Sequence, residues 1–195
     1  MYPVYRFSPG NQGYGVMVKK MLLHICCGVC AAGAAEQLLS EGFEVTGYFY
    51  NPNIHPYEEY QRRLEATRKA AEELNFPLEE GLYTPDEWMT VTESLKEEPE
   101  GGKRCEVCFR YRLDDTYRRM NTSDFDYFTT TLTIGPRKPA EIVNRIGMEI
   151  GGEKFLNRDF KKKAGFQRAT NLAKEWGIHR QDYCGCIYSM RADRT

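Results

Sequence analysis

The sequence predicts an α/β fold, a mainly parallel sheet with helices on both of its faces. The main observation is an alternation along the chain, in which short apolar or aromatic runs are separated by helical patterns of about 10–15 residues. The chain has 195 residues, which suffices for one domain with a buried core. Its composition, 41% hydrophobic and 28% charged, excludes a disordered chain or a coiled coil. The longest apolar runs are only a few residues, too short to cross a membrane.

The first elements are predicted from apolar runs and from the residues that end them. The apolar run over 21–25 predicts a buried strand. A helix follows over 31–42, where alanines and leucines share one face and Gly42 ends it. The aromatic and β-branched run over 43–50 predicts a second strand, and the two prolines in 51–56 predict a loop.

The middle of the chain continues this alternation. A strongly amphipathic pattern over 57–75 predicts a helix, and a short third strand is predicted over 78–83. The acidic segment 85–98 predicts another helix. The expected inner face of that helix consists of Trp88, Val91 and Leu95.

The remaining elements follow a glycine-containing loop over 99–102. They are a helix over 105–120, a strand over 126–132, a helix over 140–150 and, after a basic loop over 157–163, a helix over 164–176. Ligands of open α/β sheets bind beyond the carboxyl ends of the strands. Cys26 and Cys27 end the first predicted strand, and Thr129 to Thr131 lie near the end of the last one, so we expect the functional site there.

Seven cysteines are the unusual feature of the composition. An odd number excludes complete pairing within the chain, and the first twenty residues contain no continuous apolar stretch typical of a secretory signal. We therefore expect a flexible N-terminal extension over 1–20, a single domain over 21–195 and a cytoplasmic location. There, clustered thiols bind metals or carry out redox chemistry more often than they form disulfides.

All seven cysteines belong to three short motifs, which indicates metal binding. Cys105 and Cys108 are three residues apart, so they are expected on one side of a helix. Cys27 and Cys30 have the same spacing at the expected start of a helix, where thiolates are favoured. A structural zinc site needs four ligands, and seven thiols exceed one such site by three. Seven thiols suffice for a four-cysteine iron–sulfur cluster together with a second metal that keeps one position open. A single cluster with spare redox thiols is the alternative, and the spacing leaves the choice of ligands open. The three motifs comprise Cys26, Cys27 and Cys30; Cys105 and Cys108; and Cys184 and Cys186.

The net charge of −1 hides an asymmetric distribution. Residues 58–100 contain five bases and 13 acids, whereas residues 101–195 contain 19 bases and 12 acids. Such a basic half is typical either of an anion-binding surface or simply of a solvated face.

The chain resembles the QueH-type epoxyqueuosine reductases in segments spread from residue 22 to 189. One departure is Gly28-Val29, where a residue such as proline would be expected before Cys30. The matching segments are LLHICCGVC (22–30), YFYNPNIHPYEEYQRR (48–63), RCEVCFRYRL (104–113), TTTLTIGPRK (129–138), DFKKKAGFQRA (159–169) and HRQDYCGCIYS (179–189).

The resemblance implies a reaction, cofactors and partners. The epoxide of epoxyqueuosine, at the wobble position in the tRNA anticodon loop, is reduced to the alkene of queuosine and its oxygen leaves as water. The family is similar in fold to the adenine-nucleotide α-hydrolases, a three-layer Rossmann-like arrangement. It works without cobalamin, using a 4Fe-4S cluster and a second metal ion, expected to be iron. No G-x-G-x-x-G motif follows the first strand, so an external electron donor such as ferredoxin is expected.

Candidate functional residues follow from this interpretation. All seven cysteines are expected to bind the metals, with Cys26, Cys27, Tyr57 and Asp182 as catalytic candidates. A histidine on a buried strand, such as His24, is more often a core residue than a metal ligand or proton donor. The candidates for holding the modified base, ribose or phosphates of tRNA, or for stacking, are Asn51, Asn53, His55, Tyr60, Arg112, Arg137, Lys138, Lys161, Lys162, Arg168 and Arg180.

Two other functions are compatible with parts of the pattern. An ATP-dependent tRNA thiolation-like enzyme would need a Ser-Gly-Gly-x-Asp-Ser loop after the first strand, a position held here by HICCGVC. A zinc- or cluster-containing tRNA-binding or redox-sensing module would have the thiols without turnover.

Overall fold

The computed structural model describes residues 18–190, which form three layers with a parallel sheet in the middle. Residues 1–17 and 191–195 lie outside the described residues, so the flexible extension stays a prediction. Its predicted boundary needs one correction, because Lys20 already belongs to the first strand. The backbone N–H of Lys20 donates to the Asp126 carboxylate at 2.8 Å, which ties the start of that strand to the start of the last one.

The sheet has four parallel strands in the order β3-β2-β1-β4. The register pairs Leu23 of β1 with Gly47 of β2 on one side and with Thr129 of β4 on the other. A parallel sheet covered on both faces favours continuous apolar runs, such as the predicted run over 21–25. The strands are β1 (Lys20–His24), β2 (Glu44–Phe49), β3 (Leu78–Glu80) and β4 (Tyr127–Thr130).

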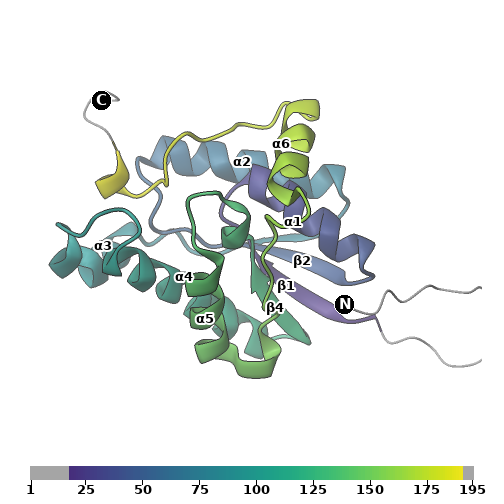
Figure 1. The fold of residues 1–195 in the computed structure, drawn as a ribbon, viewed down its shortest axis with the longest axis horizontal. Helices are drawn as coiled ribbons and strands as arrows, with labels where there is room; N and C mark the ends of the chain where they lie inside the picture. Colours follow the sequence, from purple (N-terminus) through teal and green to yellow (C-terminus); the bar gives the residue numbers. More distant parts are fainter. Residues whose placement is uncertain (1–17, 191–195) are drawn as a thin grey trace, which may run out of the picture.

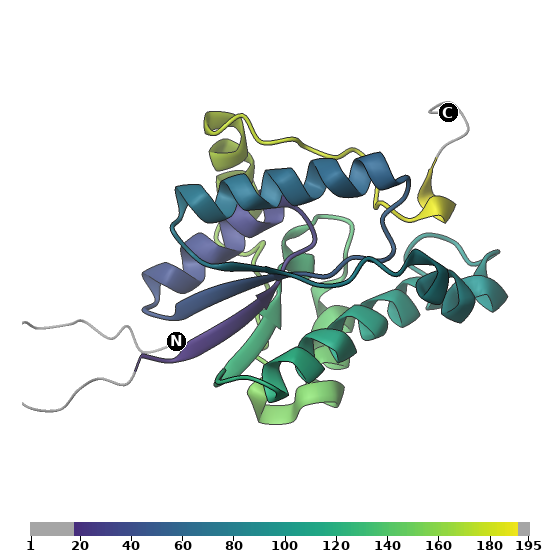
Figure 2. The same ribbon diagram turned by 180° about the vertical axis from the view of Figure 1, so that it is seen from behind.

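The helices cover both faces of the sheet, as predicted. Helices α1, α2 and α6 lie on one face and α4 and α5 on the other (Figures 1 and 2). Within the described residues, no helix combines the length and the apolar character needed to cross a bilayer. The helices are α1 (Gly28–Ser40), α2 (Tyr57–Glu73), α3 (Pro85–Thr92), α4 (Lys103–Asn121), α5 (Ala140–Gly151) and α6 (Gly165–Glu175).

The strand order creates a switch point between β1 and β4. The chain runs from β1 outward through β2 to β3, and then returns to the other side of β1 to form β4. The segments that leave β1 and β4 therefore diverge to opposite faces of the sheet, which opens a site at their carboxyl ends.

Helix α1 begins at Gly28, three residues earlier than predicted, and includes Cys30 in its first turn. Glycine is required at its start because a Cβ on residue 28 would lie 2.3 Å from the backbone oxygen of Ala66 in α2. At Gly33, a Cβ would lie 2.6 Å from the Cβ of Ala169 in α6. Small residues thus let α1 pack closely between two helices.

The inner face predicted for the acidic helix is wrong at Val91. Trp88 is fully buried, but Val91 is 43% exposed and Thr92 is buried in its place. Thr92 is four residues after Trp88 and so shares its face, and its hydroxyl donates to the Trp88 carbonyl oxygen at 2.9 Å. The helix gives way at Glu93 to a 3-10 turn that contains the half-buried Leu95.

Two predicted strands are shorter than expected. β3 ends at Glu80 rather than at residue 83, and β4 ends at Thr130. A 3-10 turn, Thr131–Ile134, continues from β4, and the Thr130 hydroxyl accepts from the N–H of Leu132 at its start. This turn directs the chain away from the sheet edge and toward the first cysteines.

Candidate metal centre

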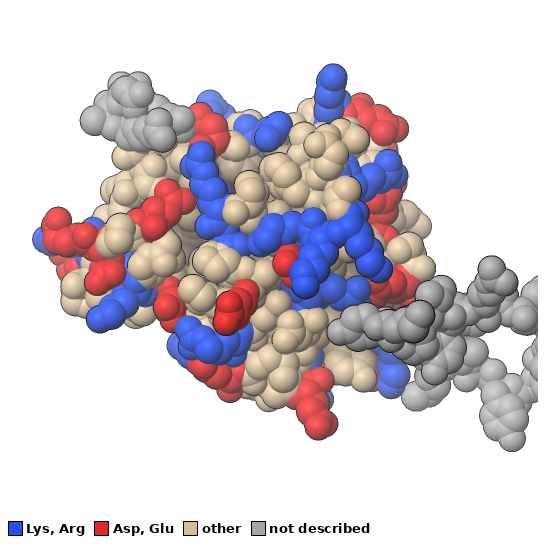
Figure 3. Space-filling model, in the orientation of Figure 1, with Lys and Arg blue, Asp and Glu red and all other residues tan. Residues whose placement is uncertain are grey.

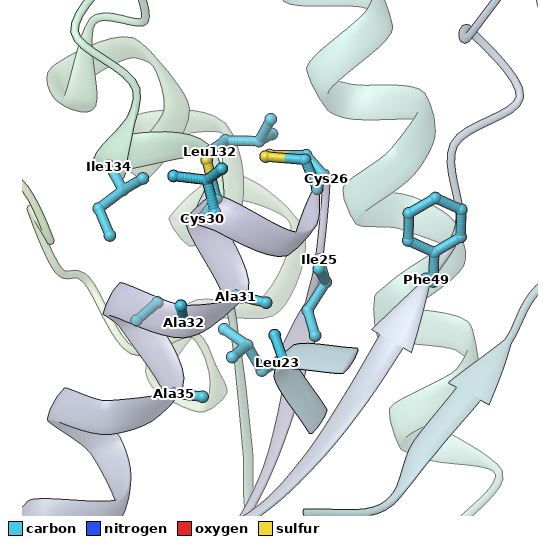
Figure 4. Close-up of a cluster of buried hydrophobic side chains, with 14 of the residues drawn as sticks. Leu23, Ile25, Cys26, Cys30, Ala31, Ala32, Ala35, Phe49, Leu132 and Ile134 are labelled. Carbon is cyan, nitrogen blue, oxygen red and sulfur yellow. The ribbon is translucent and has the colours of Figure 1, made fainter. Parts of the chain in front are cut away.

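The first cysteine group lies at the junction of β1 and α1. The sulfur atoms of Cys26, Cys27 and Cys30 lie within 4.8 Å of one another, and all three side chains are buried. Cys27 is the residue immediately before the helix, so the three thiols surround its N-terminal end, where thiolates are favoured. Figure 4 shows Cys26 and Cys30 together at the edge of the apolar core, near Leu132.

Polar neighbours make one of these thiols acidic. The N–H of Cys26 donates to Thr131 Oγ1 at 3.1 Å, and that hydroxyl lies 3.3 Å from Cys26 Sγ. Gln181 Nε2 donates to Cys27 Sγ at 2.8 Å. Hydrogen bonds from the Cys27 and Cys30 thiols hold the pKa of Cys26 well below its usual value, and the contact with Cys26 raises the pKa of Cys27 to about 12. The group therefore favours a thiolate at Cys26, the form that binds metals.

The other four cysteines form a second group from two distant segments. Cys105 and Cys108 lie near the start of α4, and Cys184 and Cys186 lie in the segment after α6. Cys108 and Cys186 are buried together with Trp88 in one small apolar cluster. A hydrogen bond from Cys186 holds the pKa of Cys184 well below its usual value, whereas burial raises the pKa of Cys105 and of Cys108.

Two cations lie between the cysteine groups. Arg112 of α4 is 2% exposed, and its pKa is raised because the effect of burial is outweighed by thiolates such as Cys108 and Cys184. The pKa of the half-buried Lys138 is raised in the same way, with burial opposed by thiolates at Cys184 and Cys26. Positive charge between the groups fits two anionic metal–thiolate sites.

A cavity of about 450 Å³ opens beside both groups. Cys30 lines it from the first group and Cys184 from the second. Its walls also bring together cations, the carboxylates of Glu100 and Asp182 and the rings of Phe166 and Tyr183. Cations and aromatic rings are the groups needed to hold an anionic, base-containing ligand. Further lining residues are Arg137, Lys138, Arg180 and Gln181.

The three predicted residues of the 51–56 loop make contacts inside the protein. Asn51 is 1% exposed; its Nδ2 donates to the carbonyl of Ile25 at 2.8 Å and its Oδ1 accepts from Arg112 at 3.2 Å. His55 Nδ1 lies 3.0 Å from the carbonyl oxygen of Asn53, whose own side chain is 1% exposed. None of these three residues is among the described residues that line the cavity. Asn51 instead fixes the loop after β1 and orients Arg112.

The two predicted tyrosines form an aromatic cluster on α2. Tyr57 is half exposed and its ring lies 6.0 Å from that of Tyr60, which is 4% exposed and packs edge-on against Phe49. Both also contact the ring of Tyr83. In the described part of the chain, this cluster is separate from the residues that line the cavity.

The basic side chains divide into cavity residues and surface residues. Lysines and arginines form a band across one face of the molecule (Figure 3). Arg137, Lys138 and Arg180 line the cavity, and Lys162 is exposed.

Two other predicted cations have partners within the protein. Arg168 forms an ion pair with Glu36 of α1 at 2.5 Å. Lys161 Nζ donates to the carbonyl oxygens of Thr133 and Lys138, at 3.1 and 2.9 Å. Lys161 thereby supports the loop that carries Lys138.

Sequence reasoning overlooked several residues of the site. Phe166 and Gln181 line the cavity, and Arg63 of α2 contacts the segment that carries Cys184. All three lie inside the family-like segments quoted above, which was the signal available. His24, in contrast, is a neutral core residue: burial lowers its pKa to about 3, and its ring bonds Thr130 and the carbonyl oxygen of Tyr50.

Known proteins of one family are similar to this chain over nearly all of its described residues. A family model described as epoxyqueuosine reductase QueH matches residues 21–192. A protein of that name from Streptococcus pyogenes is 39% identical over 180 residues, covering 88% of this chain and 70% of its own length. Another from Thermotoga maritima is 37% identical over 179 residues, covering 87% and 90%.

A solved structure supports the fold. The NMN synthetase from Francisella tularensis matches with a TM-score of 0.51 over 87% of this chain and 68% of that one. The sequences are 15% identical, so the likeness concerns the Rossmann-like arrangement of sheet and helices alone.

Proposed function

The chain belongs to the epoxyqueuosine reductase QueH family, and from this premise we propose that it reduces epoxyqueuosine in tRNA to queuosine. The observation that carries the proposal is the cavity lined by one thiol from each cysteine group, within a chain matched by the family over residues 21–192. The reaction consumes two electrons and two protons, breaks both C–O bonds of the epoxide to leave an alkene, and releases its oxygen as water.

The donor sets fit a metal cluster and a second metal. The sulfur atoms of Cys26, Cys27 and Cys30 lie within 4.8 Å of one another and suit an open site. The remaining four cysteines equal in number the ligands of a closed site. Beside the group of four, two buried nitrogens have no acceptor among the described residues: Arg104 Nε and Arg112 Nη2. Buried donors without partners are costly, and the sulfur atoms of an anionic cluster would accept from them.

We therefore propose a division of the ligands. Cys105, Cys108, Cys184 and Cys186 hold a 4Fe-4S cluster, while Cys26, Cys27 and Cys30 hold a second iron. When bound, these groups supply the electrons and a Lewis acid for the epoxide oxygen. In this proposal, Cys26 and Cys27 contribute to catalysis as metal ligands.

The remaining residues bind and position the substrate. Arg137 and Arg180 in the cavity wall are suited to the phosphates that flank the wobble nucleotide. Phe166 offers a ring on which an unstacked base can lie. Asp182 lines the same cavity and is our preferred proton donor; Tyr57, in the aromatic cluster on α2, remains the alternative.

The electrons are proposed to come from an external carrier such as ferredoxin, and no cobalamin takes part. We assign the reaction to the cytoplasm, where tRNA is modified and thiols remain reduced.

The experiment is anaerobic purification with iron and sulfide counts, followed by incubation with epoxyqueuosine tRNA and a strong chemical reductant. Loss of the mass of one oxygen from the nucleoside is expected. Cys30→Ser and Cys186→Ser should each abolish this conversion, whereas Ser40→Ala, at the exposed far end of α1, should not. An active enzyme that contains only zinc, or full activity in both cysteine variants, would refute the proposal.

A further inference from the structure

The segment that carries Cys184 and Cys186 has little regular structure of its own. Residues 178–186, here called the C-terminal strap, leave the end of α6 and contain no helix or strand. Residues 180–184 line the cavity of about 450 Å³ that lies beside the cysteine groups. The other side of the strap, together with Glu59 and Arg62 of α2, borders a second cavity of about 540 Å³. The strap is thus a thin wall between two open spaces and needs support from another element.

Arg63 of α2 provides that support. Its Nη1 donates to the carbonyl oxygen of Cys184 at 2.9 Å, and its Nη2 donates to the carbonyl oxygen of Tyr183 at 3.1 Å. Its Nε donates to Glu59 Oε1 at 2.6 Å, so all three nitrogens of the guanidinium are engaged. Arg63 is 3% exposed, and its charge also lies 5.2 Å from the centre of the Tyr183 ring.

The surrounding contacts hold the guanidinium in one orientation. Glu59 is 5% exposed, and its second oxygen lies 3.3 Å from His179 Nε2 at the start of the strap. The N–H of His55 donates to the carbonyl of Gly185 at 2.7 Å, and the Tyr183 hydroxyl donates to the carbonyl of His55. Three consecutive strap carbonyls, from Tyr183 to Gly185, are therefore held by α2 and the loop that precedes it.

Gly185 is matched to this arrangement. Its φ of +108° is a conformation that other residues rarely adopt, and a Cβ there would lie 2.8 Å from Arg63 Nη1. The glycine between the two cysteines thus lets the guanidinium approach the strap backbone. A side chain at this position would displace the arginine or the strap.

We propose that Arg63 is a positioning residue for Cys184. It fixes the two peptide carbonyls on either side of the Cys184 Cα, those of Tyr183 and Cys184. It thereby sets the direction in which the Cys184 side chain leaves the strap, toward Cys186 and the cations between the cysteine groups. The guanidinium is suited to this because it is a rigid fork of donors, which a lysine ammonium cannot reproduce. The inference rests on the proposed function only in taking Cys184 as a metal ligand.

The test compares Arg63→Lys with Arg62→Lys, a matched control on the exposed side of the same helix. In the protein purified anaerobically with its metals, Arg63→Lys should lose iron and sulfide and weaken metal affinity about ten- to hundredfold, as changes in supporting contacts do. In the metal-free protein, alkylation followed by mass spectrometry should find Cys184 and Cys186 modified at altered rates, and Cys26 and Cys30 at unchanged rates. Arg62→Lys should match the unsubstituted protein in both measurements.

Gly185→Ala is the second variant, because it disturbs the same contact from the other side. It should reproduce the selective change at Cys184 and Cys186. Unchanged iron content and alkylation in both variants would overturn the proposal, and so would equal exposure of all seven thiols, which is the result expected for general destabilisation. Iron and alkylation are measured without tRNA, so failure of the unsubstituted protein to reduce epoxyqueuosine would refute the proposed function and leave this test intact.

Discussion

At the scale of single residues, the hydroxyl of Thr131 links the end of β4 to Cys26, the first cysteine of the proposed metal site. It accepts from the Cys26 N–H and contacts Cys26 Sγ, and this contact helps to keep the pKa of Cys26 low. Thr131→Val keeps the shape but removes both bonds, so we expect the free energy of unfolding to fall by about 1 kcal/mol. Iron retention should fall as well, and urea titration and iron counts measure the two effects. Thr131→Ser retains the hydroxyl and should stay close to the unsubstituted protein; a loss in Thr131→Ser without one in Thr131→Val would show that the methyl group matters instead.

Tyr60 gives a prediction about pH. Burial raises its pKa from 10.0 to about 12, so the folded protein favours the neutral phenol. The stabilisation is complete below pH 10 and is lost as the pH rises from 10 to 12, by up to about 1.4 kcal/mol per pH unit. Tyr60→Phe lacks this titration. Denaturant unfolding at pH 9 and 11 should therefore show a smaller loss of stability in the variant, and parallel losses would contradict the assignment.

Single residues also show where the sequence was sufficient and where it was not. The cysteine ligand candidates could be identified because thiols that gather in short motifs are rare, whatever their neighbours. The role of Asn51 could not, because it depends on the carbonyl of Ile25 and on Arg112, which only the folded chain brings near. Arg63 was overlooked for the same reason: its helical spacing from Tyr60 and Thr67 places it on the buried face of α2, but its partners are carbonyls far along the chain.

At the scale of elements, α1 is held by two neighbouring helices at positions that tolerate no side chain. We expect Gly28→Ala to destabilise the protein by about 2 kcal/mol despite the better helix propensity of alanine, because the new Cβ would meet the Ala66 carbonyl at 2.3 Å. The shift of α1 should also reduce iron binding, since Cys27 and Cys30 flank residue 28. Thermal unfolding and iron counts provide the measurement.

Gly135→Ala is the control for that prediction. Gly135 has ordinary backbone angles, and a Cβ there would come no closer than 3.8 Å to another residue. The free energy of unfolding of Gly135→Ala should therefore differ from that of the unsubstituted protein by only about a few tenths of a kcal/mol. A Gly28→Ala protein as stable as this control would mean that α1 and α2 separate at little cost.

The elements themselves were largely predictable because β1 is an apolar run, β2 and β4 are rich in aromatic and β-branched residues, and helical patterns separate the strands. The prediction was wrong where tertiary contacts override the pattern. Val91 has the spacing of a core residue but is exposed, since α3 turns Trp88 and Thr92 inward instead. The end of β4 at Thr130 likewise depends on the turn that leads toward Cys26, which strand propensity does not encode.

At the scale of the whole molecule, the uneven charge of the sequence becomes a surface with two kinds of cation. Some arginines of the basic C-terminal half neutralise acids of the N-terminal half: Arg168 pairs with Glu36, and Arg158 pairs with Glu41. Others line the cavity beside the cysteines, as Arg137 does. The count of basic residues therefore overstates the charge available to a polyanion, and position decides which of them contribute.

This difference predicts how tRNA binding responds to salt. Each cation that neutralises a phosphate releases counterions, so its removal should lower the slope of log affinity against log salt by about one. We expect that change for Arg137→Gln and Arg180→Gln, which remove charge from the cavity wall. Arg168→Gln should have a smaller effect, because its charge is already balanced by Glu36. Filter binding of unmodified tRNA over a range of salt concentrations measures all three slopes. If Arg168→Gln changed the slope most, the tRNA backbone would contact the surface around Arg168, and the assignment of the flanking phosphates to Arg137 and Arg180 would be wrong.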